Sequence, residues 1–268
     1  MGVIEKYKDR ILYYQIEGFN LKKNINLNYG SQQPSHLHEE KELMLNNRMN
    51  HIFSTRTGWN QENIFKSLSG VMEIPEEKIY RAKQVHGTDI LIIDKQNYKD
   101  VMKEERDGLI TNIKGIALAT YHADCVPIYF YDNKKEIIGL AHAGWKGTLN
   151  NISETIINGM VKNFKSNIED ISVAIGPSIG KCCYEIGQDV EKLFMDKFSG
   201  EKDIIEKRDK RLYLNLVEVN RINLMELGIK EENIFYSNFC TSCNINSLYS
   251  YRKENGTKNR MVAAISLN

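Results

Sequence analysis

Short blocks of apolar residues, separated by polar and turn-forming residues, run along most of this chain and predict many strands. Two β-branched and aromatic runs, residues 126–131 and 136–141, flank the polar segment 132–135. This arrangement is typical of a β-hairpin or of two neighbouring strands. Further apolar runs predict strands at residues 11–16, 80–85, 90–94, 115–120, 171–175, 234–240 and 261–267, and residues 107–111 predict a turn that leads into a strand.

A second pattern, with apolar residues three and four positions apart, predicts helices between the strands. It occurs in residues 149–160, where Thr148 is the expected N-cap, and again before Gly228, which we expect to end the last helix. Residues 1–50 give the weakest pattern, in which residues 31–38 suggest a loop and residues 40–48 a short helix. Together the two patterns indicate a mixed α/β (α+β) fold, and we expect one domain over residues 1–268.

The composition is that of an ordinary globular protein. The chain has 268 residues, of which 41% are hydrophobic and 26% charged, and this length is enough to bury a core without cross-links. The net charge of +1 gives no indication of a nucleic-acid or membrane partner. Five cysteines, two of them adjacent, suit a reducing compartment better than a disulfide framework. With no membrane-length apolar run and no signal-peptide pattern, we expect a cytoplasmic protein.

Three residues form a candidate metal site. Cys125 precedes the first strand of the predicted hairpin and His142 follows the second. These two strand ends are expected to lie side by side, which would bring the two residues together. His86, in the segment KQVHG, is the third candidate. Two imidazoles and one thiolate are a suitable ligand set for zinc, with a fourth position left open for water or substrate. The alternative is a buried, inert cysteine with structural histidines.

Neighbouring polar residues could support such a site. His122, three residues before Cys125, is expected to line the pocket rather than to bind the metal. Asp124 could accept a hydrogen bond from a ligand imidazole, act as a proton acceptor, or simply hold its turn through local backbone bonds. Gln84 could orient a ligand or contact the substrate. The pair His36 and His38 could bind metal, but a solvated loop is the expected outcome.

Basic residues suggest an anion subsite. Lys146 lies beside a glycine-flanked helix start, a position that favours anions. Arg56, in the segment FSTRTG, could bind phosphate through its planar guanidinium or form a surface salt bridge, and the two alternatives stay open. Arg252 lies in an aromatic and basic stretch that could form a wall of a nucleoside pocket.

The other four cysteines invite a second metal interpretation. Cys182 and Cys183, together with the pair Cys240 and Cys243, could close a four-cysteine zinc site. Adjacent cysteine side chains generally point in different directions, so we expect ordinary packing of small residues here.

Several motifs carry a resemblance to a known family. The segments QVHG, ADCVPI, HAGWKGT and IGPSIGKCCYEIG, with residues 216–228, resemble in sequence and order the YfiH/YlmD-type family, also called the laccase-domain or polyphenol oxidase family. The resemblance runs from about residue 53 to the C-terminus. It implies that His86, Cys125 and His142 are the metal ligands. Trp59 stands where the family usually has a second glycine, so this wall of the pocket departs from the family pattern.

The resemblance also implies a fold and an activity. The fold would be a single-domain layered sandwich of β-sheets flanked by helices, with the active site at one end. The activity would be zinc-dependent phosphorolysis of purine nucleosides (inosine, adenosine and methylthioadenosine), with adenosine deamination as a further reaction. The same resemblance leaves copper-dependent oxidation of phenols open. A hydrolase that edits cell-wall precursors, with Cys125 as nucleophile and His142 as base, and a non-enzymatic binding role are further alternatives. The sequence does not choose between a monomer and a homodimer.

Overall fold

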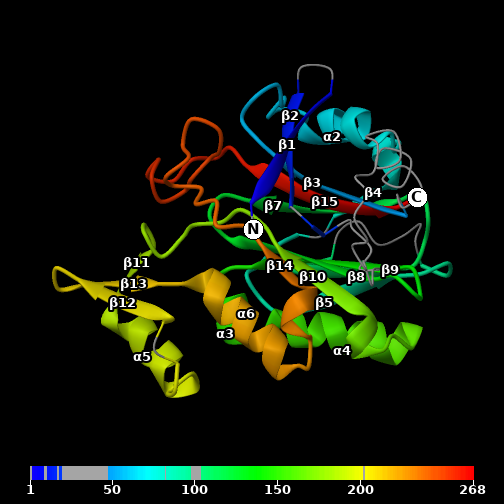
Figure 1. The fold of residues 1–268 in the computed structure, drawn as a ribbon. Helices are drawn as coiled ribbons and strands as arrows, with labels where there is room; N and C mark the ends of the chain where they lie inside the picture. Colours follow the sequence, from blue (N-terminus) through cyan, green and yellow to red (C-terminus); the bar gives the residue numbers. More distant parts are fainter. Residues whose placement is uncertain are drawn as a thin grey trace, which may run out of the picture.

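Two six-stranded sheets lie face to face in the part of the chain that the computed structural model describes, residues 2–8, 11–16, 18–19, 48–81, 83–97, 104–201 and 203–268 (Figure 1). In spatial order the first sheet consists of β1 (Val3–Lys8), β2 (Ile11–Ile16), β3 (Met49–Ser54), β15 (Met261–Leu267), β7 (Ala117–His122) and β4 (Ile79–Arg81).

The second sheet carries the central hairpin of the chain. In spatial order its strands are β14 (Ile234–Tyr236), β10 (Ile171–Ile175), β8 (Val126–Asp132), β9 (Ile137–Ala143), β6 (Gly108–Thr111) and β5 (Ile90–Ile93). A small third sheet of β11 (Glu185–Ile186), β13 (Arg211–Leu214) and β12 (Ile205–Arg208) lies to one side with helix α5 (Gln188–Lys197), as Figure 1 shows.

Strand alternation divides the apolar residues among three cores. Along β15, Met261, Ala263 and Ile265 face the space between the two large sheets, whereas Val262 and Ala264 face outward. The outward residues pack with the buried side of helix α2 (Ile64–Met72), which is held at its start by a hydrogen bond from the Lys66 N–H to Asn63. Successive side chains of a strand point to opposite faces, so one strand serves two cores.

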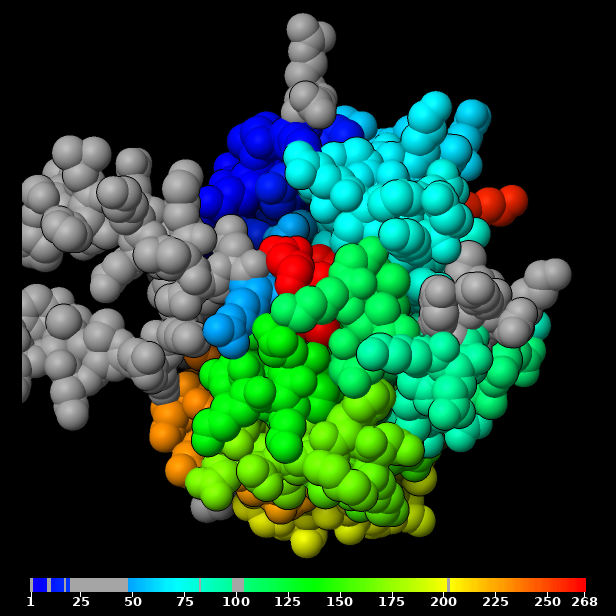
Figure 2. All heavy atoms as spheres, turned by 90° about the vertical axis from the view of Figure 1, so that its right-hand side faces the viewer, coloured from blue at the N-terminus to red at the C-terminus, as the bar shows by residue number. Residues whose placement is uncertain are grey.

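The second sheet is covered in the same way on its outer face. Val126, Ile128 and Phe130 of β8 pack with helices α3 (Trp145–Leu149), α4 (Ile152–Phe164) and α6 (Leu216–Glu226). The layers are therefore helix, sheet, sheet and helices (Figure 1), which confirms the predicted mixed α/β layered sandwich. Figure 2 shows the molecule from the side, where the C-terminal end of the chain (red) is visible between the blue and cyan part above and the green part below.

The register of the central hairpin determines where the candidate ligands lie. Strands β8 and β9 are antiparallel, with Val126 opposite Ala143 and Pro127 opposite His142. The hairpin was predicted, but β9 runs on through His142, so this histidine lies within the strand rather than after it. It faces the inter-sheet space in line with Ile138 and Leu140.

Several local predictions need correction. Thr148 does not cap the long helix, because α3 begins earlier, after Gly144, and a break follows it. The cap of α4 is Asn151, whose side-chain oxygen accepts the N–H of Glu154 at 3.3 Å. The predicted strands 80–85 and 234–240 are shorter, since β4 ends at Arg81 and β14 at Tyr236.

Other predictions have different outcomes. Gly228 ends the last helix with a left-handed backbone, as expected. The loop at residues 31–38 with His36 and His38, and most of the helix at residues 40–48, lie outside the described residues. No helix in the described ranges is long and apolar enough to cross a membrane.

We expect Phe130→Ala to lower the free energy of unfolding by about 3–5 kcal/mol, the usual cost of truncating a buried aromatic residue. Phe130 is fully buried between the second sheet and its helices. Urea denaturation would measure the change, with Tyr7→Ala as control because Tyr7 is 66% exposed. Equal stability of the two variants would contradict the placement of this core.

Candidate metal centre and its surroundings

The structure brings His86, Cys125 and His142 together from three parts of the chain. Their ligand atoms all lie within 4.8 Å of one another. His86 is on the loop after β4, Cys125 is in the turn between β7 and β8, and His142 is near the end of β9. His86 is exposed, Cys125 half-buried and His142 buried, so the group opens to solvent on one side.

Asp107, just before β6, organises this group. Its buried carboxylate accepts hydrogen bonds through Oδ1 from His142 Nδ1 at 2.8 Å and from the His86 N–H at 3.0 Å. Its other oxygen, Oδ2, accepts the N–H groups of Val85 at 3.1 Å and Gly87 at 2.7 Å. One carboxylate therefore fixes the ring of one histidine and the backbone around the other.

The charge state of Asp107 is set by these bonds. Burial opposes its ionisation, but the hydrogen bonds from His142, Gly87 and Val85 outweigh burial and hold its pKa below the usual range. The ionised carboxylate keeps the proton of His142 on Nδ1. Nε2 of that ring is then left as the atom with a lone pair, which is the arrangement a metal-binding histidine needs.

The pKa values of the other groups fit a neutral imidazole and a thiol that needs a cation. Burial lowers the pKa of His142, more than the bond to Asp107 raises it. Burial and the nearby Asp124 carboxylate raise the pKa of Cys125 to about 12. Without a metal this thiol stays protonated at neutral pH, whereas a bound metal would convert it to thiolate.

Gly144 gives the group the space it needs. A Cβ at this position would lie 2.9 Å from Cδ2 of His86 and 3.4 Å from Sγ of Cys125. The backbone at the start of α3 thus comes closer to the candidate ligands than any other residue type would allow.

His122 is not a fourth ligand in this structure. Its Nδ1 bonds to the carbonyl oxygen of Cys125 at 3.0 Å and its Nε2 to the hydroxyl of Thr120 at 2.8 Å. Both ring nitrogens are therefore occupied, in keeping with the expected lining role. Its ring lies 5.3 Å from that of His142, centroid to centroid, across the space between the sheets.

Asp124 and Gln84 make structural contacts. The carboxylate of Asp124 accepts the Thr241 hydroxyl at 2.6 Å and the Arg252 N–H at 2.7 Å, so it braces a distant loop instead of a ligand imidazole. Gln84 pairs through its amide with both backbone groups of Tyr121, at 2.7 and 2.8 Å. That pair holds the His86 loop against β7.

The three predicted basic residues differ in whether their charged groups already have a hydrogen-bond or ion-pair partner. Arg56 forms an ion pair with Glu254 at 2.5 Å and bonds the Leu248 carbonyl, which is the salt-bridge alternative. Arg252 bonds the carbonyl oxygen of Glu185 at 2.8 Å. Lys146 is exposed and makes no ion pair with any residue that the structure describes.

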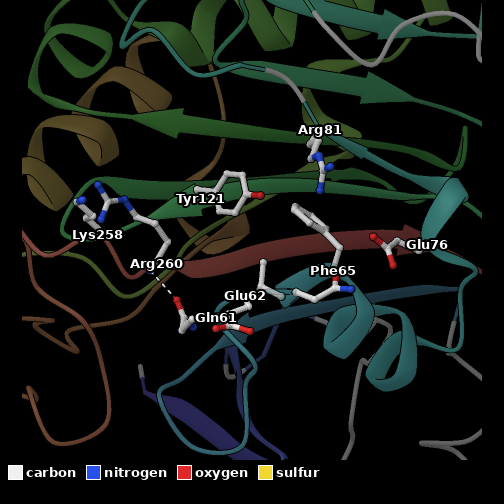
Figure 3. A pocket seen from close by; sticks show the side chains of 10 residues that line it. Gln61, Glu62, Phe65, Glu76, Arg81, Tyr121, Lys258 and Arg260 are labelled. Carbon is white, nitrogen blue, oxygen red and sulfur yellow. Dashed lines mark hydrogen bonds between the residues drawn. The ribbon is translucent and has the colours of Figure 1, made fainter.

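A cavity of about 280 Å³ lies on the side of the first sheet that α2 covers (Figure 3). Arg81 stacks over the Phe65 ring at 3.9 Å, and Phe65 meets Tyr121 edge to face. Arg260, anchored through its N–H to Gln61, lines the cavity. Its positive charge partly opposes the rise in the pKa of Cys125 and adds to the fall in the pKa of His142. Arg260 therefore lies within electrostatic reach of both the cavity and the candidate ligands.

Two of the residues around the group were not singled out from the sequence. Asp107 was recognised only as part of a turn, although an acid before a buried strand is a signal. Tyr184 carries no local signal, whereas Arg260 lies in the same aromatic and basic stretch of the chain as Arg252. Burial and the Cys125 side chain raise the pKa of Tyr184 to about 12.

The expectation that the side chains of Cys182 and Cys183 diverge is wrong. The Sγ atoms of Cys182, Cys183, Cys240 and Cys243 also lie within 4.8 Å of one another. The adjacent pair sits on a tight turn, in which the N–H groups of Cys183 and Tyr184 both bond the Gly180 carbonyl. Side chains on such a turn need not point to opposite sides, as they do on a strand.

We expect Asp107→Asn to weaken metal binding by about 10–100-fold, the usual effect of losing the partner of a ligand histidine. Each oxygen of Asp107 accepts two hydrogen bonds. In either orientation of the asparagine amide, its NH2 group would replace one of these oxygens and face two hydrogen-bond donors. Competition with a chelator would measure the affinity, and Asp196→Asn on the exposed side of α5 is the matched control. An unchanged affinity would remove Asp107 from this role.

Comparison with known proteins gives a consistent result. A family model described as multi-copper polyphenol oxidoreductase laccase matches residues 53–268. "Purine nucleoside phosphorylase YlmD" of Geobacillus stearothermophilus is 34% identical over 208 residues, 75% of this chain and 76% of that protein. "Purine nucleoside phosphorylase LACC1" of Homo sapiens is 31% identical over 77% of this chain, which spans only 47% of the human protein.

A solved structure agrees with the fold. The crystal structure of YlmD from Geobacillus stearothermophilus superposes with a TM-score of 0.76 at 29% identity and covers 83% of this chain and 93% of that one. Since the family match takes in most of the chain and the Geobacillus protein aligns over three quarters of it, this chain belongs to the multi-copper polyphenol oxidoreductase laccase family, which includes YfiH and YlmD.

Proposed function

We propose that this protein is a zinc-dependent purine nucleoside phosphorylase. It would cleave inosine, adenosine or methylthioadenosine with phosphate to give the free base and a ribose 1-phosphate. The observation that carries the proposal is the group of His86, Cys125 and His142 oriented by Asp107. The names of the YlmD and LACC1 relatives supply the reaction class.

The donor set fits zinc. Two imidazole nitrogens and one sulfur, with ligand atoms within 4.8 Å of one another, leave a fourth tetrahedral position open. A bound zinc would act as a Lewis acid on a substrate oxygen. Copper also accepts imidazole and thiolate, so copper-dependent oxidation of phenols is the alternative to be tested.

A cysteine hydrolase is less well supported. The raised pKa of Cys125 reflects burial and the Asp124 carboxylate, and both disfavour a free nucleophilic thiolate. His142 has its Nδ1 bonded to Asp107 and lies across the hairpin from Pro127. The same features suit metal ligands, because a bound metal ion would supply the positive charge that stabilises a buried thiolate.

Lys146 is our candidate for the phosphate. It follows His142 by four residues, is exposed, and has no carboxylate partner in the described ranges. Arg56 is less suitable, since Glu254 already neutralises its charge. A single lysine acts as a point charge on phosphate and does not hold two oxygens as a guanidinium can.

The nucleoside would lie against Tyr184 and Arg252. Arg252 stacks above the Tyr184 ring at 5.1 Å, and its backbone is held by Asp124, the residue next to Cys125. An aromatic ring and a guanidinium next to the candidate ligands suit a flat purine. Adenosine deamination is proposed as a second reaction of the same site, in which water would add to C6 of the purine and ammonia would leave.

We expect metal removal to abolish cleavage of inosine and added zinc to restore it. Cys125→Ser should lose the metal of this site while the far-ultraviolet circular dichroism stays unchanged, because a serine hydroxyl is a far poorer ligand than thiolate. Metal analysis and an assay on the same sample would test this. Restoration by copper alone, together with turnover of phenols, would overturn the zinc proposal.

We expect inosine cleavage to require phosphate, and Lys146→Ala to raise the KM for phosphate by about 3–10-fold, the effect of one exposed charge-assisted bond. The KM for inosine should change little. Lys162→Ala, on the exposed side of α4, is the matched control. Chromatographic identification of the products decides the reaction type, since free ribose formed equally fast without phosphate would indicate a hydrolase.

A further inference from the structure

We propose that Cys182, Cys183, Cys240 and Cys243 bind a second metal ion, a structural Zn²⁺ held by four sulfurs. Their Sγ atoms all lie within 4.8 Å of one another. They form a group of their own, separate from His86, Cys125 and His142. Four thiolates around one ion leave no open position, which is the hallmark of structural zinc sites.

The sulfur spacing suits a metal better than a disulfide. Sγ of Cys243 lies 3.5 Å from that of Cys182 and 3.4 Å from that of Cys183. Zinc–sulfur bonds of about 2.3 Å in a tetrahedron separate neighbouring sulfurs by roughly 3.8 Å, so a small outward shift would admit the ion. A disulfide would need two of these sulfurs to close from about 3.4 Å to about 2.05 Å, a much larger movement.

Two tight turns present the sulfurs. One is the turn that begins at Gly180 and carries Cys182 and Cys183. The other carries Cys240 and Cys243, where the N–H and the side-chain amide of Asn244 both bond the Cys240 carbonyl, at 3.1 and 2.8 Å. Two residues between paired cysteines is the spacing that zinc-binding turns use.

Gly180 adds a backbone donor to the group. Its N–H bonds Sγ of Cys240 at 3.2 Å, an interaction that favours the thiolate form of a ligand. A Cβ at this position would lie 3.2 Å from Sγ of Cys182 and 3.3 Å from Cβ of Cys240. The absence of a side chain thus lets the two turns approach closely.

The proposed ion would join the two segments that brace the Cys125 turn. Next to the first cysteine pair, the Ile179 N–H bonds the carbonyl oxygen of Asp124 at 2.9 Å. Next to Cys240, the Thr241 hydroxyl bonds the Asp124 carboxylate at 2.6 Å. The ion would therefore stabilise the loop that carries Cys125, without contact with the substrate.

Metal counting on paired variants tests the proposal. Wild-type protein purified under reducing conditions should contain two zinc ions per chain. Cys243→Ser, at an exposed position, should lose one of them, and Cys125→Ser should lose the other. Cys182→Ser, also exposed, serves as a second variant of the same site. The proposal is overturned if the wild type holds one ion that Cys125→Ser removes and Cys243→Ser retains.

Alkylation of the wild-type protein gives a test that does not depend on a variant folding. With metal bound, Cys182 and Cys243 should resist a maleimide despite their exposure, and a chelator should open both to labelling. Rapid labelling of both before chelation, or an intact mass that shows a disulfide within the group, overturns the proposal. Metal counting and alkylation are both measured without an activity assay, whereas the proposed function is tested by phosphorolysis, so the two proposals can fail separately.

Discussion

The four hydrogen bonds to the Asp107 carboxylate are the constraint on which the candidate metal centre depends. A buried carboxylate is costly unless its oxygens are fully bonded, and here each oxygen accepts two donors. Three of the donors are backbone N–H groups of the loop that carries His86, and the fourth is the ring of His142. Because the charge is satisfied only when loop and strand come together, its burial selects the arrangement that the ligands need.

The two sheets supply the rigid frame for this interaction. Asp107 precedes β6, and its carbonyl oxygen also accepts the His142 N–H at 2.7 Å, so carboxylate and ring are held by backbone pairing. His86 stands on a loop with φ of +62°, a conformation that costs energy for a residue with a side chain. The hydrogen bonds that Val85, His86 and Gly87 donate to Asp107 offset that cost.

Sequence patterns identified site residues whose positions follow from local structure. They missed residues whose positions depend on contacts between distant parts of the chain. Cys125 and His142 could be paired because the hairpin brings them together, whereas no local pattern places His86 beside them, and it was a third candidate by residue type that the family resemblance supported. Asp107 was missed because its partners lie 20 to 35 residues away and share no motif with it. The proximity of the four cysteines was not expected, because the rule of diverging neighbours suits strands, whereas Cys182 and Cys183 lie on a turn. Thr148 was a reasonable cap by residue type, but tertiary packing started the helices elsewhere.

Hydrogen bonds to Asp124 connect the four-cysteine group with the group of His86, Cys125 and His142. The Asp124 backbone has φ of +88°, which is strained for a residue other than glycine, and such a residue persists only where its surroundings hold it. Here the holding contacts come from Ile179 and Thr241, each next to a segment of the four-cysteine group. Cys125 comes directly after Asp124, so its sulfur position depends on segments distant in sequence. A fold of this size does not need metal to build its core, yet it can use one to fix a strained turn beside its ligands.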